Sequence, residues 1–276
     1  MTLKDIQRIF NRSLSRTFTL KKMLIIAVVL ALCGILEVFF RSLGYHASKW
    51  VIMSLTFVPL FLCTGVLLSA GIWLIRVYHD EIKGKQVSYS EVLSRSWEII
   101  IGASYFAIPI LISYLLVWML LGIFMLLKAV PGIGDFFVAV LAFAPFLLNV
   151  TSLLLCIFSV LLLYFITPIV ALKGINRMQL ANVVTKRLQG DIFTNLLLGG
   201  IAILPLCVCI GVLSTAAILT ESMCLACEKP VYNAVQSFFV MIPFAALLAP
   251  AVIFFFNFAA ESHVLMKSQE LDKVEE

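Results

Sequence analysis

Six long runs of apolar residues constrain this chain more than any other feature. About 20 apolar residues are needed to cross the hydrocarbon layer of a bilayer, so runs of this length predict transmembrane helices. Hydrophobic residues make up 62% of the 276 residues and charged residues only 13%, which excludes a water-soluble globule. The predicted spans are 23–40, 51–75, 99–127, 146–172, 192–219 and 235–260.

The apolar run from Phe136 to Leu172 is too long for one spanning helix and slightly too short for two helices and a turn. We interpret it as one span that begins near Phe146, preceded by an interfacial or re-entrant piece. Pro145 and Asn149 mark the expected break, because proline lacks a backbone donor and clashes with the preceding turn. Whether the run crosses once or twice is left open at this point, and it decides on which side every later loop lies.

A short polar stretch, SYSEVLSRSW, precedes the third predicted span and has the pattern of an amphipathic helix. Ser88 and Glu91 have the spacing of a capping box, in which each side chain satisfies a backbone donor at the start of a helix. Leu93 and Trp97 share the apolar face, and Arg95 lies on the polar one. We therefore expect a helix in the membrane interface, with its tryptophan at the depth of the lipid headgroups.

Similar capping patterns occur at Thr2 and Asn176, which stand 86 residues before and 88 residues after Ser88. Each copy precedes a pair of predicted spans. The alternative interpretation is that basic, weakly amphipathic loops are common in any multi-pass protein. The repeated pattern predicts one all-α membrane domain (1–276), a bundle of six spans in three tandem units, each an interfacial amphipathic helix and a transmembrane hairpin. The units are 1–80, 81–173 and 174–262, followed by a short polar tail, 263–276.

The basic residues are distributed unequally between the two sides of the predicted bundle. If the amphipathic segments and both termini share a side, that side holds 16 of the 20 Lys and Arg residues. The positive-inside rule then predicts a cell (inner) membrane protein with both termini in the cytoplasm. The basic residues left for the other side are Arg41, Lys49, Lys128 and Lys229.

Cations on the polar edges of the three amphipathic segments are candidates for contacts with anionic lipid headgroups. The bilayer is thus the expected partner. Nucleic acid is not, because the charges occupy short connectors instead of one patch. The candidates are Arg8, Arg12, Arg16, Arg95, Lys186 and Arg187.

Four polar residues inside predicted spans are candidates for a polar interior: Asn149, Asn195, Asn257 and Glu37. The asparagines either line a path or form hydrogen bonds between helices. Glu37 either pairs with Arg41, four residues on, or belongs to an ion or proton path.

Cys224 and Cys227 form a C-x-x-C sequence in the last predicted outer loop. A local disulfide or an idle pair of thiols is expected there, and redox exchange or half of a metal site are the alternatives. The sequence contains no set of acid, base and nucleophile at catalytic spacing, so we predict neither an enzyme nor a cofactor or metal site.

The stretch GKQVSYSEVLSRSWEIIIGASYF, with the Thr167-Pro168 pair in a later span, resembles uncharacterised bacterial multi-pass families. It is similar to the membrane domain attached to some glycerophosphodiester phosphodiesterases. The resemblance implies repeats of a basic in-plane segment and a hydrophobic hairpin. It implies an architecture and no activity.

Two functions fit these observations. A transport or transport-accessory protein is indicated by the polytopic build and by the prolines inside the spans. The alternative is a membrane-organising or scaffold protein that acts through the interfacial helices of its cytoplasmic face.

Overall fold

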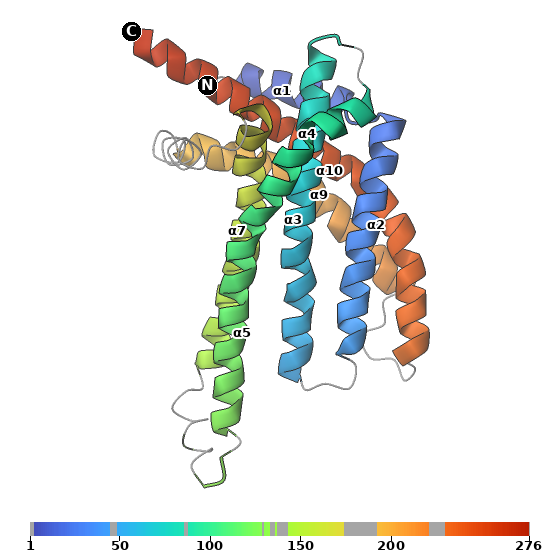
Figure 1. Cartoon of the computed structure of the whole chain (residues 1–276), viewed down its shortest axis with the longest axis vertical. Coiled ribbons are helices and arrows are strands. Elements are labelled where there is room, and N and C mark those ends of the chain that lie inside the picture. Colours follow the sequence, from blue (N-terminus) through green and yellow to red (C-terminus); the bar gives the residue numbers. More distant parts are fainter. Residues whose placement is uncertain are drawn as a thin grey trace.

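The chain folds into α-helices, as the computed structural model in Figure 1 shows. The structure describes residues 3–44, 49–85, 88–128, 130–132, 136, 143–173, 192–220 and 230–275, and no β-strand occurs among them. The helices are α1 (Leu3–Ser15), α2 (Leu20–Leu43), α3 (Lys49–Ile82), α4 (Tyr89–Ser104), the 3₁₀ turn η1 (Tyr105–Ala107), α5 (Ile108–Lys128), α7 (Ala144–Lys173), α9 (Ile192–Leu219) and α10 (Pro230–Glu275).

Within the described ranges, six segments are long and apolar enough to cross a membrane, which confirms the predicted bundle of six helical spans. Both ends of the described chain lie at the same end of the bundle (Figure 1). We call this end, which holds α1, α4 and the last turns of α10, the terminal end, and the other the opposite end. Helix α1 precedes the spans α2 and α3, and α4 precedes α5 and α7. The third predicted in-plane helix, from Asn176, lies outside the described residues.

The long apolar run forms one spanning helix in its described part. Helix α7 begins at Ala144, and its apolar span covers Phe146–Leu172, as predicted. Pro145 stands in the first helical turn, where backbone N–H groups have no partner inside the helix. The N–H that proline lacks therefore costs no hydrogen bond. Pro145 therefore helps to start the helix. The break expected at Asn149 is wrong, because that residue lies inside the helix.

The predicted third span bends at η1, where α4 turns into α5 (Figure 1). Pro109, the second residue of α5, cannot donate a hydrogen bond to the carbonyl of Tyr105 four residues earlier. That carbonyl instead accepts the N–H of Ile108, which tightens the chain into a 3₁₀ turn. The bend makes α4 a helix of its own, and Trp97 on it is 56% exposed. The position of α4 in the membrane interface stays a prediction.

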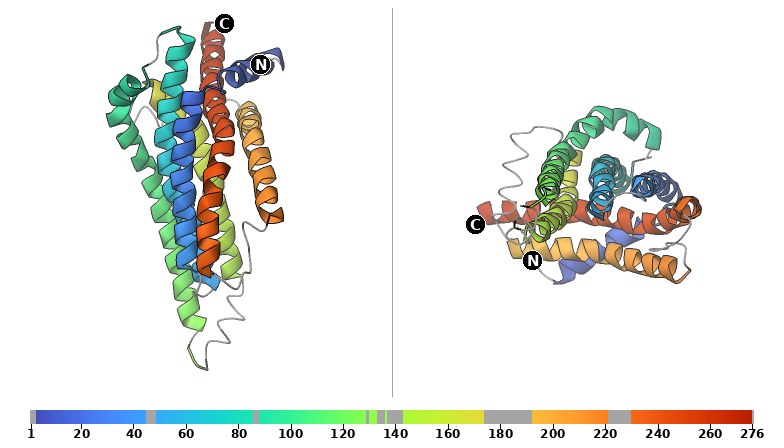
Figure 2. Two further views of the ribbon diagram at one scale, coloured as in Figure 1. Left: turned by 90° about the vertical axis from the view of Figure 1, so that its right-hand side faces the viewer. Right: turned by 90° about the horizontal axis from the view of Figure 1, so that it is seen from below.

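Helices α3, α7 and α10 form the centre of the bundle. In the most apolar 18-residue stretch of each of these helices, between 44% and 61% of the residues are buried. The corresponding share is 11% to 22% for α2, for α4 with α5, and for α9. Helix α10 runs along α2 and passes behind α3 and α7 in the view of Figure 1. Seen from below, it separates α2 and α3 from α9 (Figure 2). The outer helices therefore present most of their apolar surface outward, as expected of helices that face lipid.

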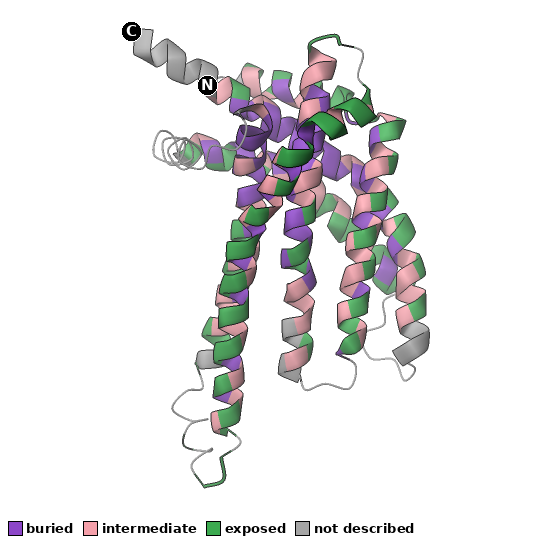
Figure 3. Cartoon of the chain, in the orientation of Figure 1, coloured by how far each residue is buried: buried purple, intermediate pink, exposed green. Residues whose placement is uncertain are grey.

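Burial is concentrated in the terminal half of the bundle (Figure 3). The fully buried residues gather on the last turns of α3, on the last turns of α7 and on α10 from Val252 to Ala260. Phe254, Phe256 and Phe258 of this stretch are among the largest fully buried side chains. The helices are thus packed most tightly at the end where both chain termini lie.

Helix α10 continues well beyond its predicted span. It contains 46 residues and extends to Glu275, so the backbone of the predicted polar tail is helical. Residues 261–275 contain no glycine or proline that would end the helix. The change from apolar to polar residues after Ala260 marks the end of the predicted span. It does not mark the end of the helix, which continues to Glu275.

Candidate functional site

Charged and polar side chains form a layer at the terminal end of the bundle. Its members come from six helices and join elements that are far apart in the sequence. They are Arg12, Lys22, Arg76, Tyr78, Glu81, Ser96, Tyr164, Glu261 and Ser262.

Lys22 is the most deeply buried charge of this layer, with a side chain that has no exposed surface. Its Nζ atom lies 2.8 Å from Oε2 of Glu81 and donates a second hydrogen bond, of 2.9 Å, to the backbone carbonyl of Arg16. A buried ammonium group is tolerated only when it is paired and hydrogen-bonded, and both conditions are met here. Lys22 thus joins the turn before α2 to the end of α3.

Glu261 joins α1, α3 and α10. Its Oε1 atom accepts a 2.8 Å hydrogen bond from the hydroxyl of Tyr78 and lies 3.4 Å from Nε of Arg12. The apolar face of α1 also packs on α10, where the rings of Phe10 and Phe254 are 5.1 Å apart. Arg12 was predicted to contact lipid headgroups, and in the structure it forms an ion pair within the protein.

Arg76 connects three helices near the end of α3. Its Nε atom donates to the carbonyl of Ala171, 3.0 Å away, and one Nη atom donates to the hydroxyl of Ser96 at 2.9 Å. The carbonyl of Ala171 belongs to the last turn of α7, where carbonyl groups have no partner inside the helix. A cation at this end also interacts favourably with the helix dipole. Arg76 therefore holds α4 and the end of α7 against α3.

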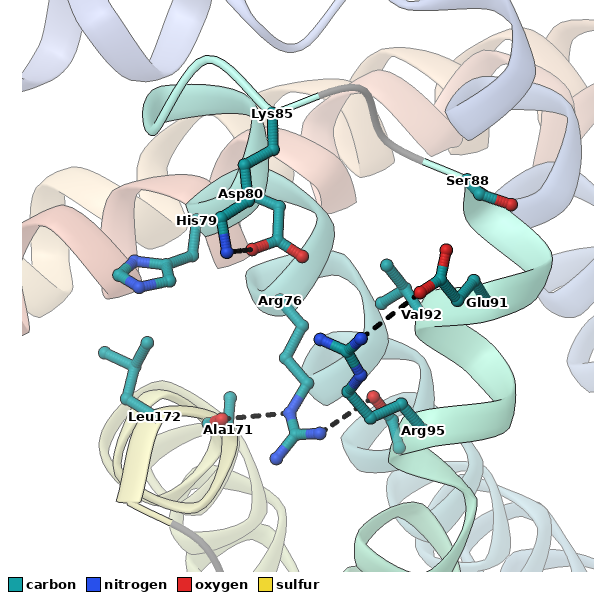
Figure 4. Close-up of a pocket in the computed structure, with 11 residues that line it drawn as sticks. Arg76, His79, Asp80, Lys85, Ser88, Glu91, Val92, Arg95, Ala171 and Leu172 are labelled. Carbon is teal, nitrogen blue, oxygen red and sulfur yellow. Dashed lines mark hydrogen bonds and ion pairs between the residues drawn. The ribbon is translucent and has the colours of Figure 1, made fainter.

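A cavity of about 310 Å³ lies beside Arg76, between α3, α4 and the end of α7. Figure 4 shows the guanidinium groups of Arg76 and Arg95 directed into the same space from two helices. We call this space the arginine cavity. It is lined by Arg76, His79, Asp80, Lys85, Ser88, Glu91, Val92, Arg95, Ser96, Ala171 and Leu172.

The turn after α3 places Lys85 at the rim of the arginine cavity. Gly84 has φ 69°, a left-handed conformation that glycine adopts without steric cost. The N–H groups of Gly84 and Lys85 donate to the carbonyls of Glu81 and Asp80, the two bonds of a Schellman motif. Nζ of Lys85 then lies 3.9 Å from Oδ1 of Asp80.

The first turn of α4 lines the other side of the cavity. Ser88 is the residue before the helix, as predicted, but its side chain makes no capping hydrogen bond. The predicted capping box is therefore wrong. Glu91 is instead within 3.2 Å of Nη2 of Arg95, one turn further along the helix.

The charges of the arginine cavity are mostly positive. Arg76, Lys85 and Arg95 are cationic, and Asp80 and Glu91 carry the opposing charges. Among the described residues, protein acceptors bind Nε and one Nη of the Arg76 guanidinium, and none binds its third nitrogen. Two guanidinium groups that face one cavity are suited to an anion with several oxygens, such as a phosphate group.

The predicted polar interior is not assembled at one place. Asn149 lies near the opposite end of α7, and Asn195 lies near the terminal end of α9. Asn257 is fully buried in α10, and neither atom of its amide has a hydrogen-bond partner within the described residues. Glu37 is half-buried in α2, where the charge of Arg41 acts on it electrostatically, although no ion pair within 4.0 Å joins the two in the described chain.

The remaining predicted contacts divide into two groups. The side chains of Arg8 and Arg16 are exposed at the terminal end, as a contact with headgroups requires. Lys186, Arg187, Cys224 and Cys227 lie outside the described residues. Within the part of the chain that the structure describes, no three His, Cys, Asp or Glu side chains are placed to hold a metal ion.

Sequence reasoning did not select Arg76, Lys85 or Ser96 as site residues. Arg76 had a visible signal, because it is a cation in the stretch GIWLIRVYHDE, close to the end of an otherwise apolar helix. Such a residue usually faces protein or water instead of lipid. Ser96 had no signal of its own, since its role follows only from the crossing of α3 and α4.

Comparison of the chain with protein-family models, with curated proteins and with solved structures finds no match to any of them. The resemblance to phosphodiesterase membrane domains therefore stays a prediction. Fold and site together define a multi-pass α-helical membrane protein with a polar, cation-rich layer at one end of its bundle.

Proposed function

We propose that this membrane protein binds the phosphate group of anionic lipids in its arginine cavity, and that it organises the membrane surface on that side. The observation that carries the proposal is the convergence of Arg76 and Arg95 on one cavity from two helices. Arginine is suited to this task, because its planar fork of donors matches the oxygens of a phosphate.

The position of the cavity supports a lipid ligand. Trp97, the residue after Ser96 of the cavity lining, is exposed on α4, and tryptophan favours the headgroup region of a bilayer. Exposed cations at Arg8 and Arg16 would attract anionic lipid toward the same end. By the positive-inside rule, this end faces the cytoplasm of the cell (inner) membrane.

The test is to count the lipids that stay bound to the purified protein. The protein is exchanged into detergent with equal amounts of phosphatidylglycerol and phosphatidylcholine, and bound lipids are identified by native mass spectrometry. The test variant is Lys85→Gln with Arg95→Gln, which removes two rim cations. The matched control is Arg41→Gln with Lys128→Gln, which removes the same charge from exposed positions at the opposite end of the bundle.

We expect the wild type and the control to retain phosphatidylglycerol in preference to phosphatidylcholine, and the cavity variant to lose most of this preference. Arg76→Lys should weaken retention as well, because lysine keeps the charge but not the fork of donors. Equal retention by all four proteins would overturn the proposal. Displacement by inorganic phosphate at constant ionic strength would show that the ligand is a soluble phosphate.

A transport or transport-accessory role is the second proposal, and Asn257 is the observation that favours it. A buried amide without a protein partner is costly, and a solute or a water chain could supply the missing hydrogen bonds. In a cysteine-free background, Asn257→Cys should react with a membrane-impermeant maleimide if a water-filled path reaches it. An unreactive thiol would count against transport through this part of the bundle.

A further inference from the structure

A second cavity lies where α2, α3 and α4 meet, and it shares no lining residue with the arginine cavity. Its volume is about 480 Å³, within the usual range for ligand pockets of about 300 to 1,000 Å³. We call it the apolar groove. Its walls include Ile25 and Val29 of α2, Val66 and Ala70 of α3, and Leu93 and Ile100 of α4.

The walls of the groove offer almost nothing to a polar ligand. The hydroxyl of Ser69 already donates to carbonyls within the protein, Gly65 at 3.0 Å and Ile100 at 3.3 Å. The indole N–H of Trp73 points to the carbonyl of Tyr89, 3.5 Å away. Since these polar atoms have partners, a ligand that needs hydrogen bonds would lose more than it gains on entering the groove.

The surface around the groove is the kind that faces lipid hydrocarbon. Leu24, Val28 and Leu32 follow each other on one side of α2 and are 61%, 53% and 62% exposed. Val66 and Leu93, which line the groove, are 45% and 42% exposed. The groove therefore opens onto the acyl chains of the bilayer, where empty space is filled by hydrocarbon and not by water.

The terminal rim of the groove has the features of a headgroup region. Lys21 is exposed one helical turn before Ile25, on the side of α2 that leads into the groove. Ser90 is exposed in the first turn of α4 and also lines the groove. A cation and a hydroxyl at the rim, above apolar walls, match a phospholipid whose chain points toward the bilayer centre.

We propose that the apolar groove binds one acyl chain of a phospholipid from the leaflet on the terminal side, with the phosphate of that lipid at the rim near Lys21. The bound chain fills the space between α2, α3 and α4 and so supports the docking of α4. This site does not depend on the arginine cavity, because it selects a hydrocarbon chain and not an anionic headgroup.

Photocrosslinking in vesicles of phosphatidylcholine alone tests the proposal. A tracer phosphatidylcholine carries a diazirine in one acyl chain, and the labelled residues are identified by mass spectrometry. The test variant is Val29→Phe, which places a ring in the groove. The matched control is Val28→Phe, the same substitution one residue earlier on the lipid-facing side of α2.

We expect labelling in the wild type to concentrate at Val66, Ala70 and Leu93. Val29→Phe should remove most of that labelling, and Val28→Phe should leave it unchanged. Ala70→Leu fills the groove from α3, and it takes the place of Val29→Phe as the test variant if Val29→Phe does not fold. Labelling spread evenly over Leu24, Val28 and Leu32, or equal labelling in both phenylalanine variants, would overturn the proposal. Because no anionic lipid is present, the result does not depend on the arginine cavity.

Discussion

The ring of Phe256 on α10 occupies the space where residue 71 of α3 would carry a side chain. A Cβ atom on Gly71 would stand 2.7 Å from both Cδ1 and Cζ of this ring and closer still to Cε1. Both residues belong to the tightly packed terminal half of the bundle. Small residues let two membrane helices approach closely, and here the absent side chain lets α10 cross α3.

Gly71→Ala should therefore destabilise the fold by about 1 to 3 kcal/mol, because the added methyl overpacks this crossing. Thermal unfolding of the purified protein in detergent measures the change. Gly211→Ala is the control, since a Cβ atom there meets nothing within 4 Å. A Gly71→Ala variant as stable as the control would show that the crossing is not tightly packed. Phe256→Leu in the same chain should restore part of the loss.

Replacing Lys22 with methionine should cost about 3 to 5 kcal/mol, because Glu81 then keeps a poorly solvated charge without its partner. Replacing both residues, Lys22→Met with Glu81→Leu, should recover much of that loss, since an apolar pair of similar volume can take the place of a buried ion pair. The exposed neighbour Lys21→Met is the control and should change stability by no more than about 0.5 kcal/mol. Equal losses for Lys21→Met and Lys22→Met in detergent unfolding would contradict the buried pair.

Tyr78→Phe removes only the hydroxyl that donates to Glu261. A hydrogen bond to a charged group contributes about 1.5 to 3 kcal/mol, so a loss of stability in this range is expected. Tyr105→Phe changes an exposed tyrosine in η1 and should be neutral. Accessibility of α1 to a protease should also rise in Tyr78→Phe, because Glu261 links α1 to the bundle through Arg12. If neither the stability nor the proteolysis of α1 changed, Glu261 would not link α1 to the bundle through Tyr78 and Arg12.

Residues in the connections before and after α7 should be labelled from opposite sides of the membrane. In a cysteine-free background, Gly132→Cys should react with an impermeant maleimide in intact cells. Lys85→Cys and Lys173→Cys should react only after the membrane is permeabilised, if the terminal end faces the cytoplasm. Reaction of Gly132→Cys and Lys173→Cys from the same side would mean that the apolar run crosses twice.

The spans could be predicted from the sequence because a bilayer imposes one simple condition, a long apolar run, on each of them. The bend at η1 also had a local cause, Pro109, although the predicted span ran through it without a break. A local pattern failed where another local contact, within the same helix, took its place. Glu91 has capping-box spacing, yet its carboxylate is within bonding distance of Arg95.

The polar layer could not be predicted, because its partners are separated by long stretches of chain. Lys22 and Glu81 are 59 residues apart, and Tyr78 and Glu261 are 183 residues apart. The sequence shows that basic residues gather at one side of the membrane. It does not show which of them also pair with a carboxylate on another helix, as Arg12 does with Glu261.

The concentration of buried residues in the terminal half implies that the bundle does not open uniformly. Local unfolding begins where few apolar contacts hold a segment, which here is the opposite end of the poorly buried helices α2, α5 and α9. Amide hydrogens there should exchange before those of α10 between Val252 and Ala260. Partial opening would therefore admit solvent or a ligand from the opposite side, while α1, α3 and α10 stay joined at the other.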